Sequence, residues 1–89
     1  MNGRKLILND GTVIEDGTCG QADGVLWCYL PDGDIRQAFA LFSDPEKTAR
    51  IRFIYGEMED VYEGYTDLTA IAAGQDGEIR VQLRKTEVI

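Results

Sequence analysis

The sequence predicts a small α+β protein. We expect an antiparallel β-meander sheet or a small open barrel of six or seven strands, with one helix at about residues 34–43 between the two halves. Three observations lead to this expectation. Short apolar runs alternate with Asp-Gly pairs, one segment has helical periodicity, and the 89 residues are 44% hydrophobic and 28% charged, as in one ordinary domain spanning residues 1–89. The pairs are Asp10-Gly11, Asp16-Gly17, Asp23-Gly24, Asp32-Gly33 and Asp76-Gly77.

Asp-Gly suits tight hairpin turns because both residues tolerate a positive φ. The first such pair lies between Leu6-Ile7-Leu8 and Val13-Ile14 and predicts the first hairpin. With a two-residue turn at Asp10-Gly11, Leu8 pairs with Val13 and Ile7 with Ile14. Asp16-Gly17 then leads into a short strand at residues 18–21.

The next hairpin turns at Asp23-Gly24 and contains both cysteines. Its second strand, Val25–Leu30, is the most hydrophobic run, so we expect it at the centre of the sheet. A two-residue turn places Cys19 opposite Cys28 at a non-hydrogen-bonded pair, where strands approach most closely. That geometry allows a disulfide, but a reducing cytoplasm favours two free thiols.

Residues 34–43 are predicted to form the one clear helix. The apolar positions recur at helical spacing on one face, which is formed by Ile35, Ala38, Phe39 and Phe42. Asp34, followed three residues later by Gln37, is the expected N-cap, and Asp32 is the alternative. Asp44 precedes Pro45 and is therefore expected to end the helix, with room for one more turn at residues 46–48.

The second half returns to a period of two. Ile51, Phe53 and Tyr55 alternate with arginines up to a turn at Gly56-Glu57. A further strand at residues 61–65, with a bulge at Gly64, leads into residues 68–73.

The last hairpin is predicted to turn at Asp76-Gly77. Ala72 then pairs with Val81 and Ala70 with Leu83, with Ile79 on the same face. Arg80, Gln82 and Arg84 fall on the opposite face.

Composition argues against several functions. Nine basic and sixteen acidic residues give a net charge of -7, which disfavours nucleic acid and anionic membrane surfaces as partners. No stretch is typical of a signal peptide or a membrane span, so a cytoplasmic or virion-associated protein is expected. The chain has no histidine and no phosphate-loop, nucleophile-elbow or zinc motif. We therefore expect no enzymatic activity, no cofactor and no metal.

The densest acidic run coincides with three tyrosines, a composition found in wet protein interfaces. The alternative is cross-strand packing with the tyrosine hydroxyls exposed. A calcium loop beginning at Asp32 is disfavoured because Arg36 and Gln37 occupy positions that require a ligand and a glycine. The candidate protein interface comprises Tyr55, Glu57, Glu59, Asp60, Tyr62, Glu63 and Tyr65.

Several segments allow comparison with a known group of proteins. They are residues 6–12, 24–29, 44–48, 55–58, 61–65 and 81–85. In these segments the chain resembles small uncharacterised proteins encoded in prophages and other mobile elements of gut-type Gram-positive bacteria. The resemblance implies a phage-type context and a role by contact, and it assigns no functional residue.

Two functions follow as hypotheses. The first is a non-enzymatic structural, assembly or protein-interaction module with a protein partner, and self-association is compatible with so small a core. The second is an acidic inhibitor that occupies the nucleic-acid-binding site of a nuclease or DNA-binding enzyme.

Overall fold

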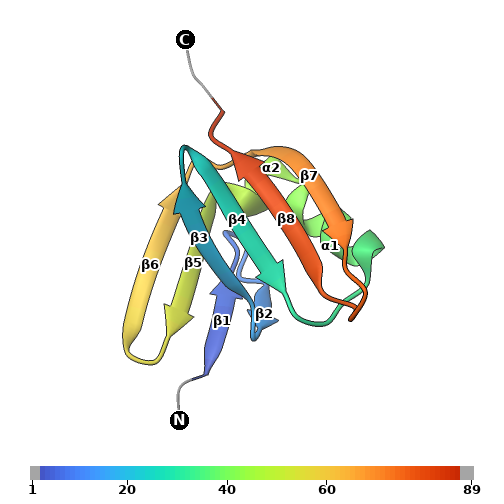
Figure 1. Cartoon of the computed structure of the whole chain (residues 1–89). Coiled ribbons are helices and arrows are strands. Elements are labelled where there is room, and N and C mark those ends of the chain that lie inside the picture. Colours follow the sequence, from blue (N-terminus) through green and yellow to red (C-terminus); the bar gives the residue numbers. More distant parts are fainter. Residues whose placement is uncertain (1–2, 87–89) are drawn as a thin grey trace.

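The computed structural model describes residues 3–86 and contains eight strands in two four-stranded antiparallel sheets, together with two short helices (Figure 1). The predicted α+β class is confirmed, but the single sheet of six or seven strands is wrong. The first sheet has the order β2-β1-β5-β6, and its strands are β2 (Val13–Glu15), β1 (Arg4–Ile7), β5 (Arg50–Tyr55) and β6 (Met58–Glu63). The second has the order β3-β4-β8-β7, with strands β3 (Thr18–Ala22), β4 (Val25–Leu30), β8 (Ile79–Arg84) and β7 (Asp67–Ala73).

The strands form four hairpins, and each sheet contains one hairpin from each half of the chain. β1 pairs with β5 to join the hairpins of the first sheet, and β4 pairs with β8 in the second. The predicted meander is therefore wrong. The connection at Asp16-Gly17 and the segment at residues 64–66 each carry the chain from the first sheet to the second. Two facing sheets can bury the apolar side of every hairpin, which explains why the chain changes sheets.

One hydrophobic core lies between the sheets. Leu6 and Ile51 of the first sheet, Leu26 and Leu83 of the second, and Phe42 of the helix are fully buried in it. The five belong to different elements, so the two sheets and the helix are stabilised together.

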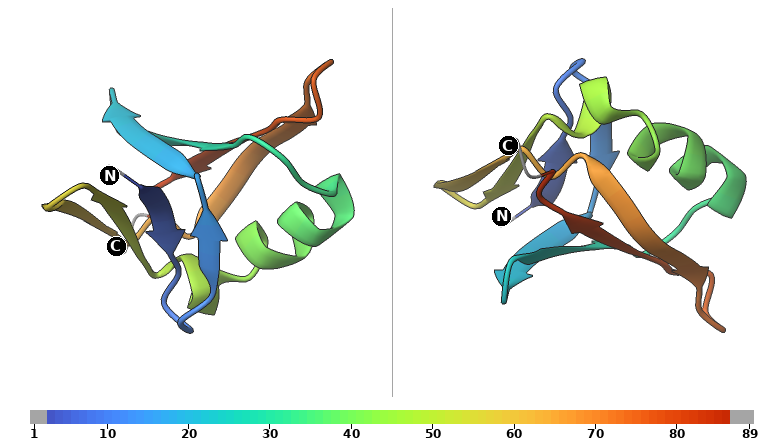
Figure 2. Two further views of the ribbon diagram at one scale, coloured as in Figure 1. Left: turned by 90° about the horizontal axis from the view of Figure 1, so that it is seen from below. Right: turned by 90° about the horizontal axis from the view of Figure 1, so that it is seen from above.

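The main helix, α1 (Ile35–Phe42), lies beside β7 (Figure 2). Ala38 and Phe42 of the predicted apolar face are buried, but Ile35 and Phe39 are 39% and 53% exposed. Leu41 packs against the core in their place. The helix contacts the sheet through a narrower stripe than its periodicity predicts, because it lies at the edge strand of the second sheet.

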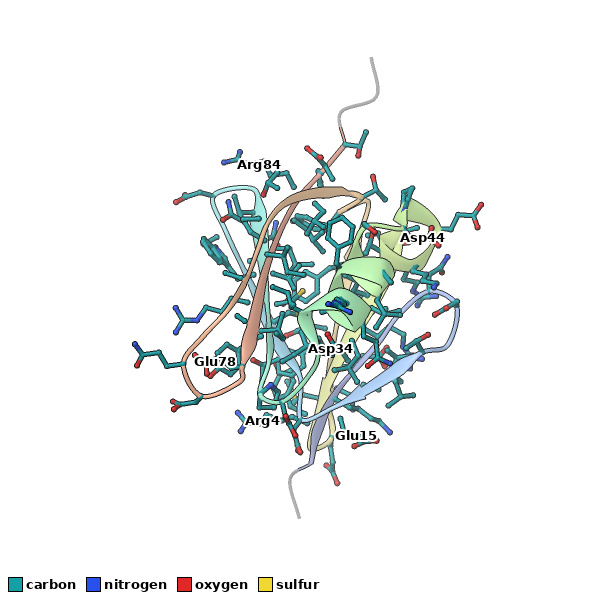
Figure 3. All side chains as sticks on the ribbon, turned by 90° about the vertical axis from the view of Figure 1, so that its right-hand side faces the viewer. Arg4, Glu15, Asp34, Asp44, Glu78 and Arg84 are labelled. Carbon is teal, nitrogen blue, oxygen red and sulfur yellow. The ribbon has the colours of Figure 1, made fainter. Side chains whose placement is uncertain are left out.

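Capping residues define both helices. The Asp34 carboxylate accepts a hydrogen bond from the Arg36 N–H at 2.8 Å, so Asp34 and not Asp32 is the N-cap. α2 (Pro45–Thr48) begins after Asp44, whose carboxylate accepts from the Glu46 N–H at 3.0 Å. Figure 3 shows both aspartates at the starts of the helices. The predicted helix and its extra turn are confirmed. Neither helix within residues 3–86 has the length and apolar character needed to cross a membrane.

The Asp-Gly hairpins have two different geometries. At Asp23-Gly24 the turn has two residues, both with positive φ (54° and 77°), and the predicted pairing of Cys19 with Cys28 is confirmed. At Asp10-Gly11 the loop has three residues, because the Leu8 N–H donates to the Thr12 carbonyl at 2.9 Å. The pairs are then Ile7 with Val13 and Leu6 with Ile14, so the predicted register is wrong by one residue.

The last hairpin has the same three-residue loop, closed by the Gly74 N–H donating to the Glu78 carbonyl at 2.8 Å. Ile71 pairs with Val81 and Leu68 with Leu83, so the predicted alanine pairs are wrong. The observed register turns Ile71 and Leu68 towards the core, and burying these larger side chains outweighs the preference of Asp-Gly for a two-residue turn. The bulge occurs between Leu68 and Ala70, whereas Gly64, with φ 85°, follows the end of β6.

Candidate functional site

Two aromatic side chains are exposed on the outer face of the second sheet. β4 alternates from Leu26 onwards, with Leu26, Cys28 and Leu30 buried on the inner side, and Val25 is buried as well. Trp27 and Tyr29 point the other way and are 50% and 41% exposed. The most hydrophobic strand of the chain therefore presents two large aromatic groups to solvent.

The strands on either side of β4 determine what surrounds these rings. Trp27 lies between Gly20 of β3 and Gln82 of β8, and Tyr29 lies between Thr18 and Arg80. Because Gly20 has no side chain, the indole is uncovered on the β3 side, and a Cβ built at Gly20 meets nothing within 4 Å. We name this surface the Trp27 face, and it consists of Thr18, Gly20, Trp27, Tyr29, Arg80, Gln82 and Arg84.

The Trp27 face carries two arginines. The Arg80 side chain is 66% exposed, and its Nη2 lies 3.5 Å from Oε1 of Glu78. Arg84 is exposed and lies opposite Asp67 in the register, at the other end of β8 from Glu78 (Figure 3). Trp, Tyr and Arg are the residue types most enriched at the energetic centres of protein interfaces. The strands hold them together on one rigid surface.

Two hollows formed by the described residues lie away from the Trp27 face. A cleft of about 200 Å³ between β2 and α1 is lined by Val13, Leu30, Gln37, Leu41 and neighbouring residues. A more open hollow of about 520 Å³ lies at the β5–β6 turn, next to Arg4, Tyr55 and Met58. Among residues 3–86, no three or more Cys, Asp or Glu side chains are grouped in a way that suits a metal ion.

The seven residues of the predicted interface do not share one surface. Tyr55, Asp60 and Tyr62 are on the side of the first sheet that faces the core, since they align with Ile51 and Phe53. The remaining acidic residues lie elsewhere: Glu59 and Glu63 are on the outer side of β6, and Glu57 is in the turn. Tyr65 is 1% exposed and belongs to the core. Its hydroxyl has no hydrogen-bond partner among residues 3–86, and Lys85 Nζ lies 5.5 Å from the ring centroid.

Several members of this group interact within the first sheet. Glu59 Oε1 lies 2.6 Å from Arg52 Nε, a hydrogen-bonded ion pair that holds the pKa of Glu59 below its usual range. The Tyr55 hydroxyl donates to Asp60 at 3.1 Å, which raises the pKa of Tyr55. Burial raises the pKa of Tyr62 to about 12. Cross-strand packing, the alternative weighed from the sequence, therefore accounts for much of this group.

The Trp27 face was not predicted from the sequence, although the sequence contains the aromatic and arginine residues that form it. The sequence predicts that Val25–Leu30 lies at the centre of the sheet, because it is the most hydrophobic run of the chain, but hydrophobicity alone does not show which of its side chains are exposed. The register nevertheless places Trp27 and Tyr29 beside Arg80 and Arg84, which were predicted to lie on the outer side of β8. Comparison with known proteins found no matching family model, curated protein or solved structure.

Proposed function

We propose that this protein is a non-enzymatic protein-interaction module that binds an acidic segment of a partner protein through the Trp27 face. The observation that carries the proposal is the exposure of Trp27 and Tyr29 beside two arginines on a regular sheet surface. A structural or assembly role in a phage-type particle is the setting that the sequence resemblance implies.

The energetics of the Trp27 face suit binding. An exposed tryptophan in water forgoes the burial of a large apolar surface, and a partner that covers it recovers that free energy. β4 is hydrogen-bonded on both sides, to β3 and β8, so the backbone that carries both rings is ordered before a partner arrives. Little backbone conformational entropy is then lost on binding.

The charges on this face favour carboxylates in the partner. A guanidinium binds a carboxylate through two parallel hydrogen bonds, and the Arg80 side chain is largely exposed. Nucleic acid is a poorer match, since a long polyanion also meets the field of a chain with net charge -7. A short acidic protein segment meets the arginines locally.

The experiment uses three tagged proteins: the wild type, Trp27→Ala and Val61→Ala. Val61 is a matched control because it is 42% exposed on the outer face of the first sheet. Partners captured from the source cells are identified, and the affinity of a purified partner for each protein is measured. We expect Trp27→Ala to weaken binding by about 30-fold or more, since a hot-spot residue contributes about 2 kcal/mol or more, and Val61→Ala to bind normally. Equal binding by all three proteins would overturn the proposal.

Trp27 also reports on its own surface, because it is the only tryptophan in the chain. Its emission is expected to shift to shorter wavelength when the partner or a Glu/Tyr copolymer covers the indole. A single-stranded oligonucleotide that produced this shift more strongly than the copolymer would contradict the acidic-protein partner.

The acidic-inhibitor hypothesis has less support from the geometry. Glu59 is paired with Arg52 and Asp60 accepts from Tyr55, so within the described part of the chain Glu57 and Glu63 are the exposed members without such an interaction. If Glu57→Gln with Glu63→Gln abolished partner binding while Trp27→Ala did not, this second function would replace the first.

A further inference from the structure

Cys19 and Cys28 face each other beneath the Trp27 face. Both thiols are free, and they occupy directly opposite positions of β3 and β4. Cys28 is 2% exposed, whereas Cys19 is half-buried on an edge strand. The pair therefore has one member that solvent can reach and one that it cannot.

The register brings these two residues close together. Counting from the two-residue turn at Asp23-Gly24, the pairs alternate between hydrogen-bonded and non-hydrogen-bonded, and Cys19 with Cys28 is of the second kind. Cα atoms of such a pair are about 4.5 Å apart, at the short end of the range of about 4.4–6.8 Å found for disulfides. The two side chains also contact each other, and this contact together with burial raises the pKa of Cys28.

We propose that Cys19 and Cys28 are an oxidisable dithiol that a hydroperoxide converts into an intramolecular disulfide. The Cys19 thiolate attacks one oxygen of the peroxide, so that a sulfenic acid forms on Cys19 and water or an alcohol leaves. The Cys28 sulfur then attacks the Cys19 sulfur, the S–O bond breaks, and a second water leaves with the Cys28 proton. Two thiols are oxidised and one peroxide is reduced.

We infer the order of these steps from the exposure of the two cysteines and from the raised pKa of Cys28. Cys19 reacts first because an oxidant can reach it from the edge of the sheet. Cys28 is a poor first nucleophile because it is buried and its raised pKa keeps it as a thiol. Its position opposite Cys19 suits it to the second step.

Closing the disulfide should change the surface above it. The Cβ atoms of opposite residues are about 4.5–5.5 Å apart in a sheet, and those of a disulfide are about 3.5–4.5 Å apart. Closing the bond therefore requires the Cys19 and Cys28 side chains to move closer together, next to Gly20 and Trp27. An effect on partner affinity rests on the proposed function, whereas formation of the disulfide does not.

The test treats reduced protein with one equivalent of hydrogen peroxide and measures intact mass and free thiols after unfolding. We expect a monomer that has lost two hydrogens and both thiols and is restored by dithiothreitol. Cys19→Ser and Cys28→Ser should each remain unable to form this species. Gain of oxygen atoms without loss of two hydrogens, or covalent dimers alone, would overturn the proposal.

Trp27 emission, recorded before and after oxidation, tests the coupling to the surface. A change that dithiothreitol reverses supports this coupling, and unchanged emission in protein fully oxidised by mass overturns it. Because neither measurement involves a partner, failure of the dithiol proposal is distinguishable from failure of the proposed function.

Discussion

The two sheets share one plan but differ in their outer surfaces. Each consists of two hairpins joined through their inner strands. On the outer side of the first sheet, cross-strand neighbours have opposite charges: Lys5 faces Glu15, Arg50 faces Glu63, and Arg52 is bonded to Glu59. On the second sheet, the equivalent central positions hold Trp27 and Tyr29.

This difference shows that exposed apolar area alone does not mark a binding surface. Val13 and Val61 on the first sheet are about as exposed as Trp27 and Tyr29. The valines are small and are separated by Ile7 and Arg52 along one row of the sheet, which is common on protein surfaces. The aromatics are adjacent along one strand, and the arginines beside them are mostly exposed. The second sheet is therefore the one for which we propose a binding role.

The largest difference that we expect between the two sheets is in partner affinity, after the charge of one matched arginine on each sheet is reversed. Arg84 and Arg50 are both exposed and both lie opposite a carboxylate, Asp67 and Glu63 respectively. We expect Arg84→Glu to lower partner affinity by about 30-fold or more, and Arg50→Glu by less than about threefold. Calorimetry with the identified partner would measure both. Equal losses would mean that overall charge and not the Trp27 face controls binding.

Two glycines, one in the second sheet and one in its last hairpin, differ in the space that is available for an added side chain. A Cβ at Gly74 would overlap Oε1 of Glu78, whereas a Cβ at Gly20 meets nothing within 4 Å. Gly74→Ala must displace a nearly buried carboxylate, so we expect a loss of about 1–2 kcal/mol in the free energy of unfolding. Gly20→Ala should be neutral or stabilising by up to about 1 kcal/mol. Urea unfolding of both variants measures this, and a destabilised Gly20→Ala would contradict the open surface beside Trp27.

Local patterns in the sequence predicted the elements but not their arrangement. Helix bounds followed from Asp34 and Pro45, since caps and proline act over a few residues. The predicted register was wrong at two of the three hairpins that turn at Asp-Gly, because Asp-Gly is compatible with both two- and three-residue loops. The choice depended on long-range packing, such as that of Ile71 against the core.

The candidate site shows the same limit. The acidic and tyrosine-rich run was predicted to form one surface. Strand alternation instead places Asp60 and Glu59 on opposite sides of β6, and Tyr65, which follows β6, is buried in the core. The Trp27 face combines β3, β4 and β8, whose residues are up to 66 positions apart in the chain, from Thr18 to Arg84, and which meet through the pairing of β4 with β8. No local pattern specifies that pairing.

The inner side of the first sheet should respond to alkaline pH through Tyr62. Its pKa is raised from 10.0 to about 12, so between these values the unfolded chain loses a proton that the folded chain keeps. Stability is then full below the unfolded pKa and falls as the pH rises towards 12. We expect Tyr62→Phe to flatten this decline, measured by urea unfolding over the alkaline range. An unchanged decline would assign it to other groups, such as the Cys28 thiol.

The smallest expected effect concerns the ion pair on the outer side of the first sheet. Arg52 lowers the pKa of Glu59, so the pair stabilises the fold above the unfolded pKa of glutamate and ceases to do so as the pH falls through the lowered value. We expect Glu59→Gln to be slightly less stable than the wild type at neutral pH and equally stable in strong acid. Both side chains are more than one-third exposed, so salt should also reduce the difference. The control is Glu63→Gln, because Glu63 lies opposite Arg50 in the register and, within residues 3–86, forms no ion pair with it. If the Glu59→Gln difference persisted in strong acid, the carboxylate charge would not be its cause, and the pairing of Arg52 with Glu59 would not stabilise the first sheet.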